Sequence, residues 1–571
     1  MCGWGIAWSQ ITISGSITSE SSEPLIGATV KLKDSTTGVI SDIDGNYSIV
    51  VPSTNSVLEF SYISYATQSI TVGNRTRIDV VMKEDSKLLG EVVVVGYGVQ
   101  KKVNVTGAVA SVNFEDMSDS RPITSVSASL AGLAAGLSSM QSSGQPGENA
   151  ATIRVRGIKT MNDNTPLVIV DGMLGTMDNL NPNDIESISV LKDAASAAIY
   201  GARAGAGVIL ITTKGGKRES KPTVNFSTRL AIMNPVNLPK VVTNYADYME
   251  LMNEAHFQSK TSPMFDQSVI DLWREKSQDP YGLTEAGYPN YVAYPNTDWM
   301  DETYNKNQIL QEHNVSINGG SEKSRYLLSI GYMNNPGLVD NTGMERINMR
   351  INFETDITKW LTLGTRTYGH KDKSGRLNFD GDFGVNSWIL QSTPGLYPLY
   401  DGKYGAKEAE QEENGAGNVR RRIDENNNGK KDFMRLNTTV FSKITLMKGL
   451  TLTSNLNYER TWRETKSWTN PRTSAAFSFS ENEQIGEFLT PSQFVTSDDR
   501  ANTSSYALEH LLSFDRSFGD HDITALFGYH EEYWKYWDLG VTKRGLIDET
   551  IHDIGSATEY RDSWGQTYDR A

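Results

Sequence analysis

The chain has 571 residues, too many for one ordinary globular domain, and its formal net charge is −15. This acidic balance argues against a nucleic-acid partner. The single cysteine, Cys2, excludes an internal disulfide framework and any metal site built from cysteines. No run of about 18 apolar residues occurs, so a membrane-spanning helix is excluded. Strands can still cross a bilayer, because only alternate residues of such a strand need to be apolar.

Residues 1–10, MCGWGIAWSQ, are apolar and uncharged. Two interpretations stay open: the remnant of a signal peptide whose basic start is missing, or a frayed end behind a misassigned start codon. Lipidation of Cys2 is disfavoured, because one preceding residue cannot form the recognition sequence for that modification.

Residues 11–84 are predicted to form a small β-sandwich, because short alternating runs follow one another at turn-separated spacing. The expected strands are Ile11–Ile17, Ala28–Leu32, Tyr47–Val51, Val57–Tyr62 and Arg77–Met82. In the hairpin segment 41–47, Asp42 and Asp44 stand as in the start of a calcium loop. The distal glutamate of such a loop is missing, so a plain Asp-Gly turn is the better interpretation and both aspartates are weak metal candidates.

Residues 85–98 are predicted to be a linker around one unusual run. Glu91 is followed there by four valines, Val92, Val93, Val94 and Val95. Consecutive valines favour extended backbone, and in an exposed linker they promote aggregation unless a partner adds a strand to them. A strand that merely joins two domains is the alternative.

Residues 99–216 are predicted to be one compact α+β domain. Strands are expected at Val105–Val112 and at 166–172, where Asp171 and Gly172 form the final turn, and a helix at Ser125–Ala135. A further strand, 153–157, would place two cations on one face, since alternate residues of a strand share a face. These cations are Arg154 and Arg156.

The stretch Asn181–Gly216 ends this domain. Asp193 is expected to cap a short helix, Ala194–Tyr200, and a buried strand is expected at Val208–Ile211. Between them lie Gly201, which ends the helix, and Gly205 and Gly207. Glycines that follow a helix and open a strand do not match a dinucleotide-binding fingerprint, so that cofactor is rejected.

Residues 217–571 contain about ten candidate strands, all between Lys221 and Thr542 and each of about ten residues. Apolar and polar residues alternate in them as in a strand between lipid and water. The clearest apolar positions are Tyr326, Leu328, Ile330, Tyr332, Ile347, Met349, Ile351, Phe353, Leu450, Leu452, Leu456, Tyr458, Ile523, Ala525, Phe527 and Tyr529. Short connections alternate with long polar ones, which indicates a membrane β-barrel. A soluble sandwich, with its apolar face inside, is the alternative.

Aromatic residues near the ends of these runs are candidates for membrane-interface bands, with ordinary buried aromatics as the alternative. They are Trp360, Tyr368, Tyr458, Trp462, Tyr533, Trp534, Tyr536 and Trp537.

Four motifs, in this order, carry a resemblance to a known family. They are EVVVVGYGVQKK (91–102), IRVRG (153–157), PLVIVDG (166–172) and NPNDIESISVLKDAASAAIYGARAGAGVILITTKGG (181–216). Together they resemble the plug domain of SusC/RagA-family TonB-dependent outer-membrane transporters. Residues 27–30 and 41–47 resemble a carboxypeptidase-regulatory-like domain, which usually precedes that plug. The resemblance implies a mainly β fold: a small β-sandwich, an α+β plug domain (99–216) and antiparallel transmembrane β-barrel strands (217–571).

The resemblance also implies roles and partners. Glu91–Val95 resembles the TonB box, which TonB, energised by ExbB and ExbD, grasps by strand addition. The motif positions of the plug are Arg154, Arg156, Gly157, Asp171, Gly172, Asp193, Gly201, Gly205 and Gly207. A SusD-like surface lipoprotein, outer-membrane lipid and an oligosaccharide or peptide ligand are the other expected partners. The expected function is import across the outer membrane, with the N-terminal and plug domains facing the periplasm and with no catalysis, cofactor or metal.

Several expectations stay open. About ten strands are too few to enclose a plug, so the chain is expected to be the N-terminal part of a longer one. Arg154 and Arg156 could tie the plug to acidic residues of the barrel, or be simple strand-edge charges. Four loop aromatics could stack on sugar rings or pack within the loops: Trp273, Tyr291, Tyr294 and Trp299. A ligand-sensing receptor or adhesin without transport, and a soluble β binding protein, are the alternative functions.

Overall fold

A computed structural model of the chain divides into two compact units, Met1–Ser111 with Ser189–Gly207, and Val112–Ile188 with Val208–Ala571. It describes residues 11–19, 23–33, 35, 37–62, 65, 67–82, 92–95, 98–101, 109–114, 117, 121–158, 161, 163–178, 180–377, 384–406, 417–468, 476–485, 493–519, 521–546 and 551–570. Residues 1–10 and Glu91, which carry the signal-peptide expectation and the start of the TonB-box expectation, lie outside the described residues.

The N-terminal part of the first unit is a two-sheet sandwich. One sheet has the order β4-β1-β7 and the other the order β3-β2-β5-β6. The strands are β1 (Ile11–Ser19), β2 (Thr29–Leu32), β3 (Gly38–Ile40), β4 (Asn46–Val51), β5 (Val57–Ser61), β6 (Gln68–Thr71) and β7 (Val80–Met82). Their alternate apolar side chains form one buried core between the sheets. The five expected strands are present. The three-residue β3 is too short for its pattern to predict it, and β6 is both short and largely polar.

The turn at Asp42 connects the two sheets rather than forming a hairpin, because β3 and β4 belong to different sheets. Asp42 Oδ1 accepts the backbone N–H groups of Asp44 at 3.0 Å and Asn46 at 2.7 Å, and Gly45 has φ +75°. The Asp42 carboxylate therefore shapes the turn. In the described part of the chain, no three His, Cys, Asp or Glu side chains gather as metal ligands would.

The valine run forms strand β8 (Val92–Val95). It pairs antiparallel with β9 (Gly98–Lys101), from Val92 opposite Lys101 to Val95 opposite Gly98. The expected extended backbone is therefore confirmed for the four valines, in a hairpin with the chain that follows.

The plug region is built from short elements. Its strands are β10 (Val109–Asn113), β11 (Leu137–Gln141), β12 (Ala151–Val155), β13 (Leu167–Val170), β14 (Met173–Leu174), β15 (Ile185–Leu191) and β16 (Val208–Thr213). The expected helix at Ser125–Ala135 is wrong in length: α3 covers only Val126–Ser129, because the chain already turns at Gly132 (φ +77°). Arg156 is not in a strand either, since β12 ends at Val155 and Arg156 has φ +57°. The two arginines therefore do not share a strand face.

The stretch after Leu191 follows its prediction closely. Asp193 caps α4 (Ala194–Ala197) through a hydrogen bond from the Ser196 N–H to Oδ1 at 2.8 Å. The helix continues as 3₁₀ turns, η3 (Ala198–Tyr200) and η4 (Ala202–Ala206), with Gly201 at φ +72° and Gly207 at φ +102° at their ends. Gly205 lies inside η4 and needs no special φ.

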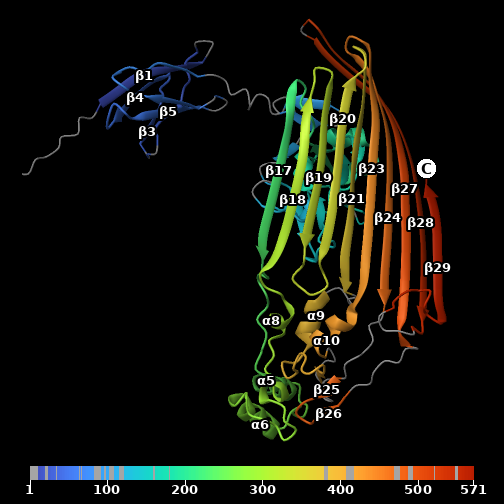
Figure 1. Cartoon of the computed structure of the whole chain (residues 1–571). Coiled ribbons are helices and arrows are strands. Elements are labelled where there is room, and N and C mark those ends of the chain that lie inside the picture. Colours follow the sequence, from blue (N-terminus) through green and yellow to red (C-terminus); the bar gives the residue numbers. More distant parts are fainter. Residues whose placement is uncertain are drawn as a thin grey trace, which may run out of the picture. The chain divides into compact units, whose positions relative to one another are not determined.

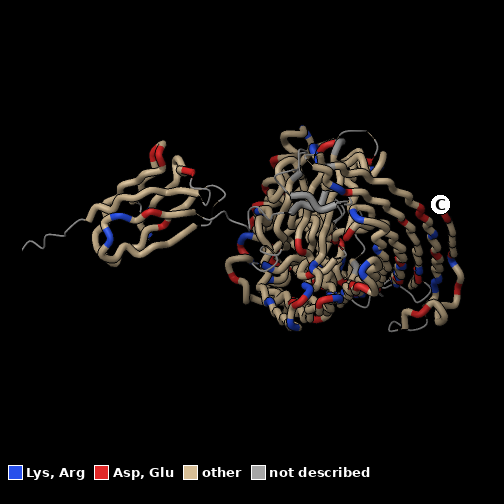
Figure 2. The backbone as a smooth tube through the Cα atoms, turned by 90° about the horizontal axis from the view of Figure 1, so that it is seen from above, with Lys and Arg blue, Asp and Glu red and all other residues tan. Residues whose placement is uncertain are grey.

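A ten-stranded antiparallel sheet, the wall, dominates the second unit (Figure 1). Its strands, in spatial and sequence order, are β17 (Ser220–Met233), β18 (Gln308–Gly320), β19 (Ser324–Asn335), β20 (Met344–Asp356), β21 (Leu361–Leu377), β23 (Asn427–Met447), β24 (Leu450–Trp468), β27 (Val495–Phe518), β28 (His521–Arg544) and β29 (Glu559–Arg570). They have 12 to 24 residues, longer than the expected ten or so. The polar pattern beyond Thr542 did not predict β29. Figure 2 looks along the strands and shows the wall as an open arc.

The wall reverses the pattern of a soluble sheet. On β20, Ile347, Met349, Ile351 and Phe353 are exposed, whereas the alternate residues Asn348, Arg350 and Glu354 are buried. The outward face is thus apolar and the covered face polar, as expected for a strand with lipid on one side. The mainly β fold class is confirmed, and no described helix is both long and apolar enough to span a membrane.

Short and long connections alternate as predicted. The short turns all lie at one end of the wall, and helices fill the long connections at the other end (Figure 1). These helices, which the sequence did not predict, are α5 (Tyr245–Gln258), α6 (Gln267–Gln278), α7 (Asn290–Ala293), α8 (Trp299–Thr303), α9 (Gly384–Gln391) and α10 (Val419–Asn426). The short strands β22 (Tyr404–Gly405), β25 (Ala476–Ser478) and β26 (Glu483–Gln484) form a small sheet there.

Candidate functional site

The plug segment, defined here as residues 112–188 and 208–216, contacts the covered face of the wall through one buried arginine. Arg350 of β20 is 1 % exposed. Its Nη1 lies 3.5 Å from Asp171 Oδ2, and its Nε lies 3.4 Å from Asp184 Oδ2. Nη1 also donates to Thr213 Oγ1 at 3.1 Å, and the guanidinium lies 5.1 Å from the centre of the Tyr368 ring. One wall cation thus contacts three plug side chains.

Local backbone geometry places the two aspartates. Asp171 directly follows β13 with φ +50°, and Gly172 comes next with φ +93°, so the chain turns back into β14. The Asp171 carboxylate accepts the N–H of Thr213 at 2.9 Å and its hydroxyl at 2.7 Å, which joins the ends of the parallel strands β13 and β16. Asp184 ends a 3₁₀ turn, η2 (Pro182–Asp184), and its carbonyl accepts the N–H of Lys214 at 2.8 Å.

A second group of contacts joins the turn before Asp184 to the first wall strands. Asn181 Nδ2 donates to Asn314 Oδ1 at 2.9 Å, and Asn183 Nδ2 donates to Glu312 Oε1 at 2.6 Å. Arg229 Nη1 donates to Asn183 Oδ1 at 2.6 Å. These partners are uncharged or paired polar groups, so the contacts can be exchanged for water without stranding an isolated charge.

Other wall cations reach plug carbonyls and loops. Arg346 donates to the Asp178 carbonyl at 3.1 Å, and Arg366 donates to the Asp171 carbonyl at 2.9 Å. Arg435 donates to the Thr176 hydroxyl, and Lys431 Nζ lies 2.6 Å from Glu148 Oε1. In the contacts that involve a cation, the wall therefore supplies the cation and the plug supplies the acceptor.

This arrangement is the reverse of the one considered for Arg154 and Arg156, in which cations of the plug would meet acidic residues of the barrel. No ion pair joins either guanidinium to a described residue of the wall. Arg154, which lies in β12, fits the strand-edge alternative, whereas Arg156 lies just beyond that strand. The sequence missed Arg350 because every second residue on β20 is polar. The local pattern does not show which of these polar residues meets the plug carboxylates. An arginine between two asparagines on the covered face, Arg350 between Asn348 and Asn352, was the available signal.

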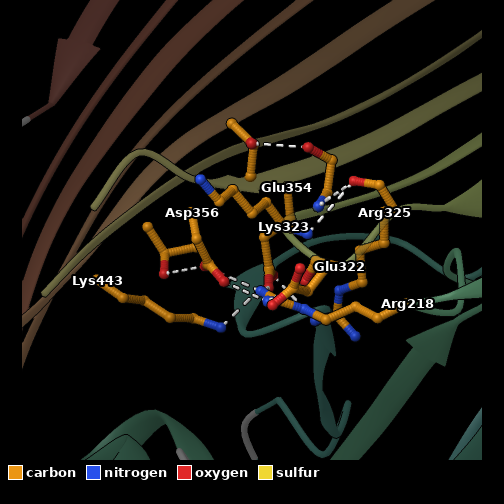
Figure 3. A network of polar contacts seen from close by, with 11 residues as sticks. Arg218, Glu322, Lys323, Arg325, Glu354, Asp356 and Lys443 are labelled. Atoms are coloured by element: carbon orange, nitrogen blue, oxygen red, sulfur yellow. Dashed lines mark hydrogen bonds and ion pairs between the residues drawn. The ribbon is translucent and has the colours of Figure 1, made fainter. Parts of the chain in front are cut away.

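The turn end of the wall fixes the chain where the plug segment ends (Figure 3). Arg218 pairs with Asp356 through two hydrogen bonds, one of them 2.9 Å from Nη2 to Oδ1, and it also lies 3.4 Å from Glu354. The Glu354 carboxylate also pairs with Arg325 at 2.9 Å and with Lys443 at 3.6 Å. Gly216 passes so close to β19 that a Cβ would stand 2.4 Å from the Tyr326 backbone nitrogen. The plug segment is thus tethered to the wall at this end.

A large cavity of about 1170 Å³ lies between the plug segment and the loop end of the wall. Plug residues 142–146 and Glu148 line one side, and loop residues such as Tyr304, Leu338 and Asn386 line another. Lys431, Arg463 and Asp499 of the wall complete it. Its volume slightly exceeds that of typical small-molecule pockets, and its lining mixes polar and apolar groups, so it can hold a solute of several rings or residues.

Two family models match the chain. The CarboxypepD_reg-like domain matches residues 13–94, and the TonB-dependent Receptor Plug Domain matches residues 101–208. TonB-dependent receptor SusC of Bacteroides thetaiotaomicron is 33% identical over 354 residues, which cover 60% of this chain and 32% of that protein. The chain belongs to the SusC/RagA family of TonB-dependent transporters.

Other relatives agree with this assignment. TonB-dependent receptor P3 of Formosa agariphila is 30% identical over 536 residues, covering 90% of this chain and 47% of that protein. The chain spans about half the length of that relative. The structure of the RagAB peptide importer in its "open-open" state matches the fold with a TM-score of 0.67 at 24% identity, covering 84% of this chain and 53% of that one. Membership of this family implies an outer-membrane location.

The motif positions of this SusC/RagA-family chain have distinct structural places. Asp171 and Gly172 form the turn that meets Arg350, while Gly157 (φ +81°) follows β12 in a left-handed conformation. Asp193, Gly201 and Gly207 shape the helical turns between β15 and β16. The Asp171 turn contacts the wall through Arg350 and Arg366.

The loop aromatics mostly pack inside the loops. Trp273 and Trp299 are 3 % and 2 % exposed, and their indole N–H groups donate to the carbonyls of Pro295 and Thr393. Tyr294 packs edge-to-face on Trp273. The sugar-stacking alternative is therefore wrong for both tryptophans, whereas Tyr291 keeps an exposed ring.

Three of the expected interface-band aromatics are on the wrong face. Tyr368 is buried under Arg350. Trp534 and Tyr536 line a cavity on the covered face of the wall. Trp360, Tyr458 and Trp537 remain exposed, as an interface band requires. The error arises because neighbouring aromatics on one strand point to opposite faces.

Proposed function

We propose that this chain provides the plug and part of the barrel of an active importer of nutrients across the outer membrane. In this proposal residues 99–216 act as the plug and residues 217–571 as barrel wall, preceded by the small domain of residues 11–84. The observation that carries it is the cluster around Arg350, in which one buried wall cation contacts Asp171, Asp184 and Thr213 of the plug segment.

The chemistry of this interface suits a plug that must be held and then moved. Apolar packing between plug and wall would resist sliding over its whole area. Buried charge pairs instead fix one geometry while adding little net stability, because desolvation offsets most of their attraction. Once the pairs separate, the polar faces on both sides are hydrated readily. The plug can therefore be specific in position and still be displaced by an applied force.

The force is proposed to come from TonB, energised by ExbB and ExbD. The strand β8 (Val92–Val95) would be grasped by strand addition, a mode in which backbone hydrogen bonds carry the affinity. The Arg218 contacts would then keep the far end of the plug on the wall while its upstream part is pulled. The N-terminal and plug domains would face the periplasm, and the helical loop end would face outside.

The ligand is proposed to be an oligosaccharide or peptide that lodges in the 1170 Å³ cavity. A SusD-like surface lipoprotein would cover the loop end. The structural relative named above is a peptide importer by its description, and the sequence relatives are TonB-dependent receptors.

Val93→Pro tests this function, because proline removes a backbone N–H from β8 and weakens strand addition. Val93→Thr is the matched control, since threonine keeps the β-branched shape and the N–H. We expect Val93→Pro to abolish ligand uptake by cells while ligand binding to isolated outer membranes stays unchanged, and Val93→Thr to retain both. Undiminished uptake by Val93→Pro would contradict the proposal and favour the receptor or adhesin alternative.

A further inference from the structure

Three cavities adjoin one another along the covered face of the wall and form a trough. The 1170 Å³ cavity shares Lys431 and Arg463 with a cavity of about 250 Å³. That cavity shares Phe433 and Arg463 with a third one of about 300 Å³. Arg463 lines all three. A site of this length fits an extended oligomer better than a compact solute.

Charge along the trough is compensated almost everywhere. Lys431 is paired with Glu148 at 2.6 Å, and Arg435 with Glu459 at 3.4 Å. Asp499, which also lines the large cavity, already has an interaction of its own. Arg463 differs: it is exposed, and no described carboxylate pairs with it. The β23–β24 register sets it directly opposite Phe433. Among its described residues, the trough therefore presents Arg463 as a cation without a paired carboxylate.

Aromatic rings adjoin this cation. Trp534 and Tyr536 of β28 line the 300 Å³ cavity together with Arg463, and the Tyr536 hydroxyl donates to Asp538 Oδ2 at 3.2 Å. The two rings are nearly parallel, with an interplanar angle of 6° and centroids 6.0 Å apart. Tyr568 of β29 extends the group at 5.4 Å from Tyr536, with an angle of 17°. Flat parallel rings beside a cavity offer a surface on which the apolar C–H faces of pyranose rings pack.

Resting on the proposed import function, we propose that this trough binds an acidic oligosaccharide. Sugar rings pack on Trp534 and Tyr536, and a carboxylate or sulfate of the same chain binds the Arg463 guanidinium. Arg463 suits either anion, because its planar donors match carboxylate and sulfate oxygens in pairs. An acidic peptide satisfies the cation but has no regular flat apolar face for the rings, so the combination favours a glycan.

The test measures binding to outer-membrane vesicles that contain the protein, by isothermal titration calorimetry with four probes. These are tetragalacturonate, a sulfated carrageenan tetrasaccharide, neutral galactotetraose and tetraglutamate. We expect one or both acidic sugars to bind at least about tenfold more tightly than galactotetraose and tetraglutamate, since a hydrogen-bonded charge contributes about that factor. The two acidic probes distinguish carboxylate from sulfate.

Variants assign the effect to residues. Arg463→Gln is expected to weaken acidic sugars about tenfold and leave galactotetraose unchanged, and Arg463→Lys is expected to retain part of the preference. Trp534→Ala is expected to weaken all three sugars. Arg460→Gln and Trp537→Ala are the matched controls, because these residues lie on the opposite face of the same two strands and should change nothing.

Equal binding of galactotetraose, an unchanged Arg463→Gln profile, or tighter binding of tetraglutamate would each overturn the inference. Binding to vesicles needs no TonB, so these outcomes leave the proposed import function standing. Conversely, if acidic sugars bind as expected and Val93→Pro cells take them up normally, the import mechanism fails while the site assignment holds.

Discussion

The guanidinium of Arg350, on wall strand β20, lies 3.4 Å from the carboxylate of Asp184 in the plug segment, and both side chains are almost completely buried. Burial raises the pKa of the Asp184 carboxyl, and the Arg350 charge opposes that rise. Each charge thus offsets part of the free-energy cost of burying the other. Removing one partner has a different effect from removing both.

Arg350→Met should destabilise the seating of the plug by about 3–5 kcal/mol, because it leaves Asp184 and Asp171 buried without a cation. Limited proteolysis of the plug in outer membranes, with denaturant titration, measures the effect. Combining Arg350→Met with Asp184→Asn should recover part of the loss. Arg460→Met, an exposed arginine on β24, is the control and should be neutral. Equal protease sensitivity of Arg350→Met and Arg460→Met would refute the buried-pair interpretation.

The defect of Arg350→Met should depend on pH. Without the cation, burial raises the Asp184 pKa further above its unfolded value. A raised native pKa gives stability that is present below the unfolded pKa and lost as pH rises through the native pKa. The variant should therefore resist protease better at pH 5 than at pH 8. A defect that is constant over this range would show that Asp184 is not the group left uncompensated.

Gly331→Ala should loosen the same interface from the wall side. A Cβ at Gly331 would stand 2.9 Å from Asn181 Nδ2 and 3.0 Å from Asn314 Oδ1, which are hydrogen-bonded to each other. We expect a loss of about 1–3 kcal/mol in plug seating, since inserting a methyl group into a filled site displaces that pair. Gly528→Ala is the control, because its Cβ would meet only Leu511 Cδ2, at 3.2 Å. The proteolysis assay used for Arg350→Met compares the two.

Met349→Arg should impair insertion of the wall into the membrane. Met349 is exposed on the apolar outward face of β20, beside Ile347 and Ile351. An arginine on the lipid face costs about 2–4 kcal/mol near the middle of the bilayer. Heat-modifiable migration of outer-membrane extracts and the amount of inserted protein measure it. Asn348→Arg, one residue away, faces the polar side and should leave insertion less affected. A tolerated Met349→Arg would argue for the soluble alternative.

The N-terminal sandwich should lose stability in strong alkali. Burial raises the pKa of Tyr47 to about 12, and its hydroxyl donates to the Ile78 carbonyl at 2.8 Å. The stability that the buried Tyr47 hydroxyl contributes is fully present below the ordinary tyrosine pKa of about 10, and it is lost as pH rises toward 12. Thermal melts of residues 11–82 from pH 9 to 12 test this. Tyr47→Phe should remove that dependence and cost about 1 kcal/mol at pH 8. An unchanged pH dependence in Tyr47→Phe would assign it to another group.

The sequence by itself determined the mainly β class, the strands of the N-terminal sandwich, the Asp193 cap and the alternation of short turns and long connections. These features depend on neighbouring residues, through period-two patterning, cap chemistry and glycine conformation, so a linear pattern contains them. It also determined which residues of β20 lie on its exposed apolar face, because alternation is a local property.

Only the tertiary structure decided what the polar residues of the covered face meet. Arg350 is one polar residue among many on the wall strands, and its partners Asp171 and Asp184 are more than 160 residues away in the sequence. The same holds for Arg463 with Trp534 and Tyr536. The sequence made these two aromatic residues candidates for a membrane-interface band, with ordinary burial as the alternative. A strand pattern distinguishes two faces, but the groups that gather on one face depend on the register of several strands and on how the plug segment lies against them.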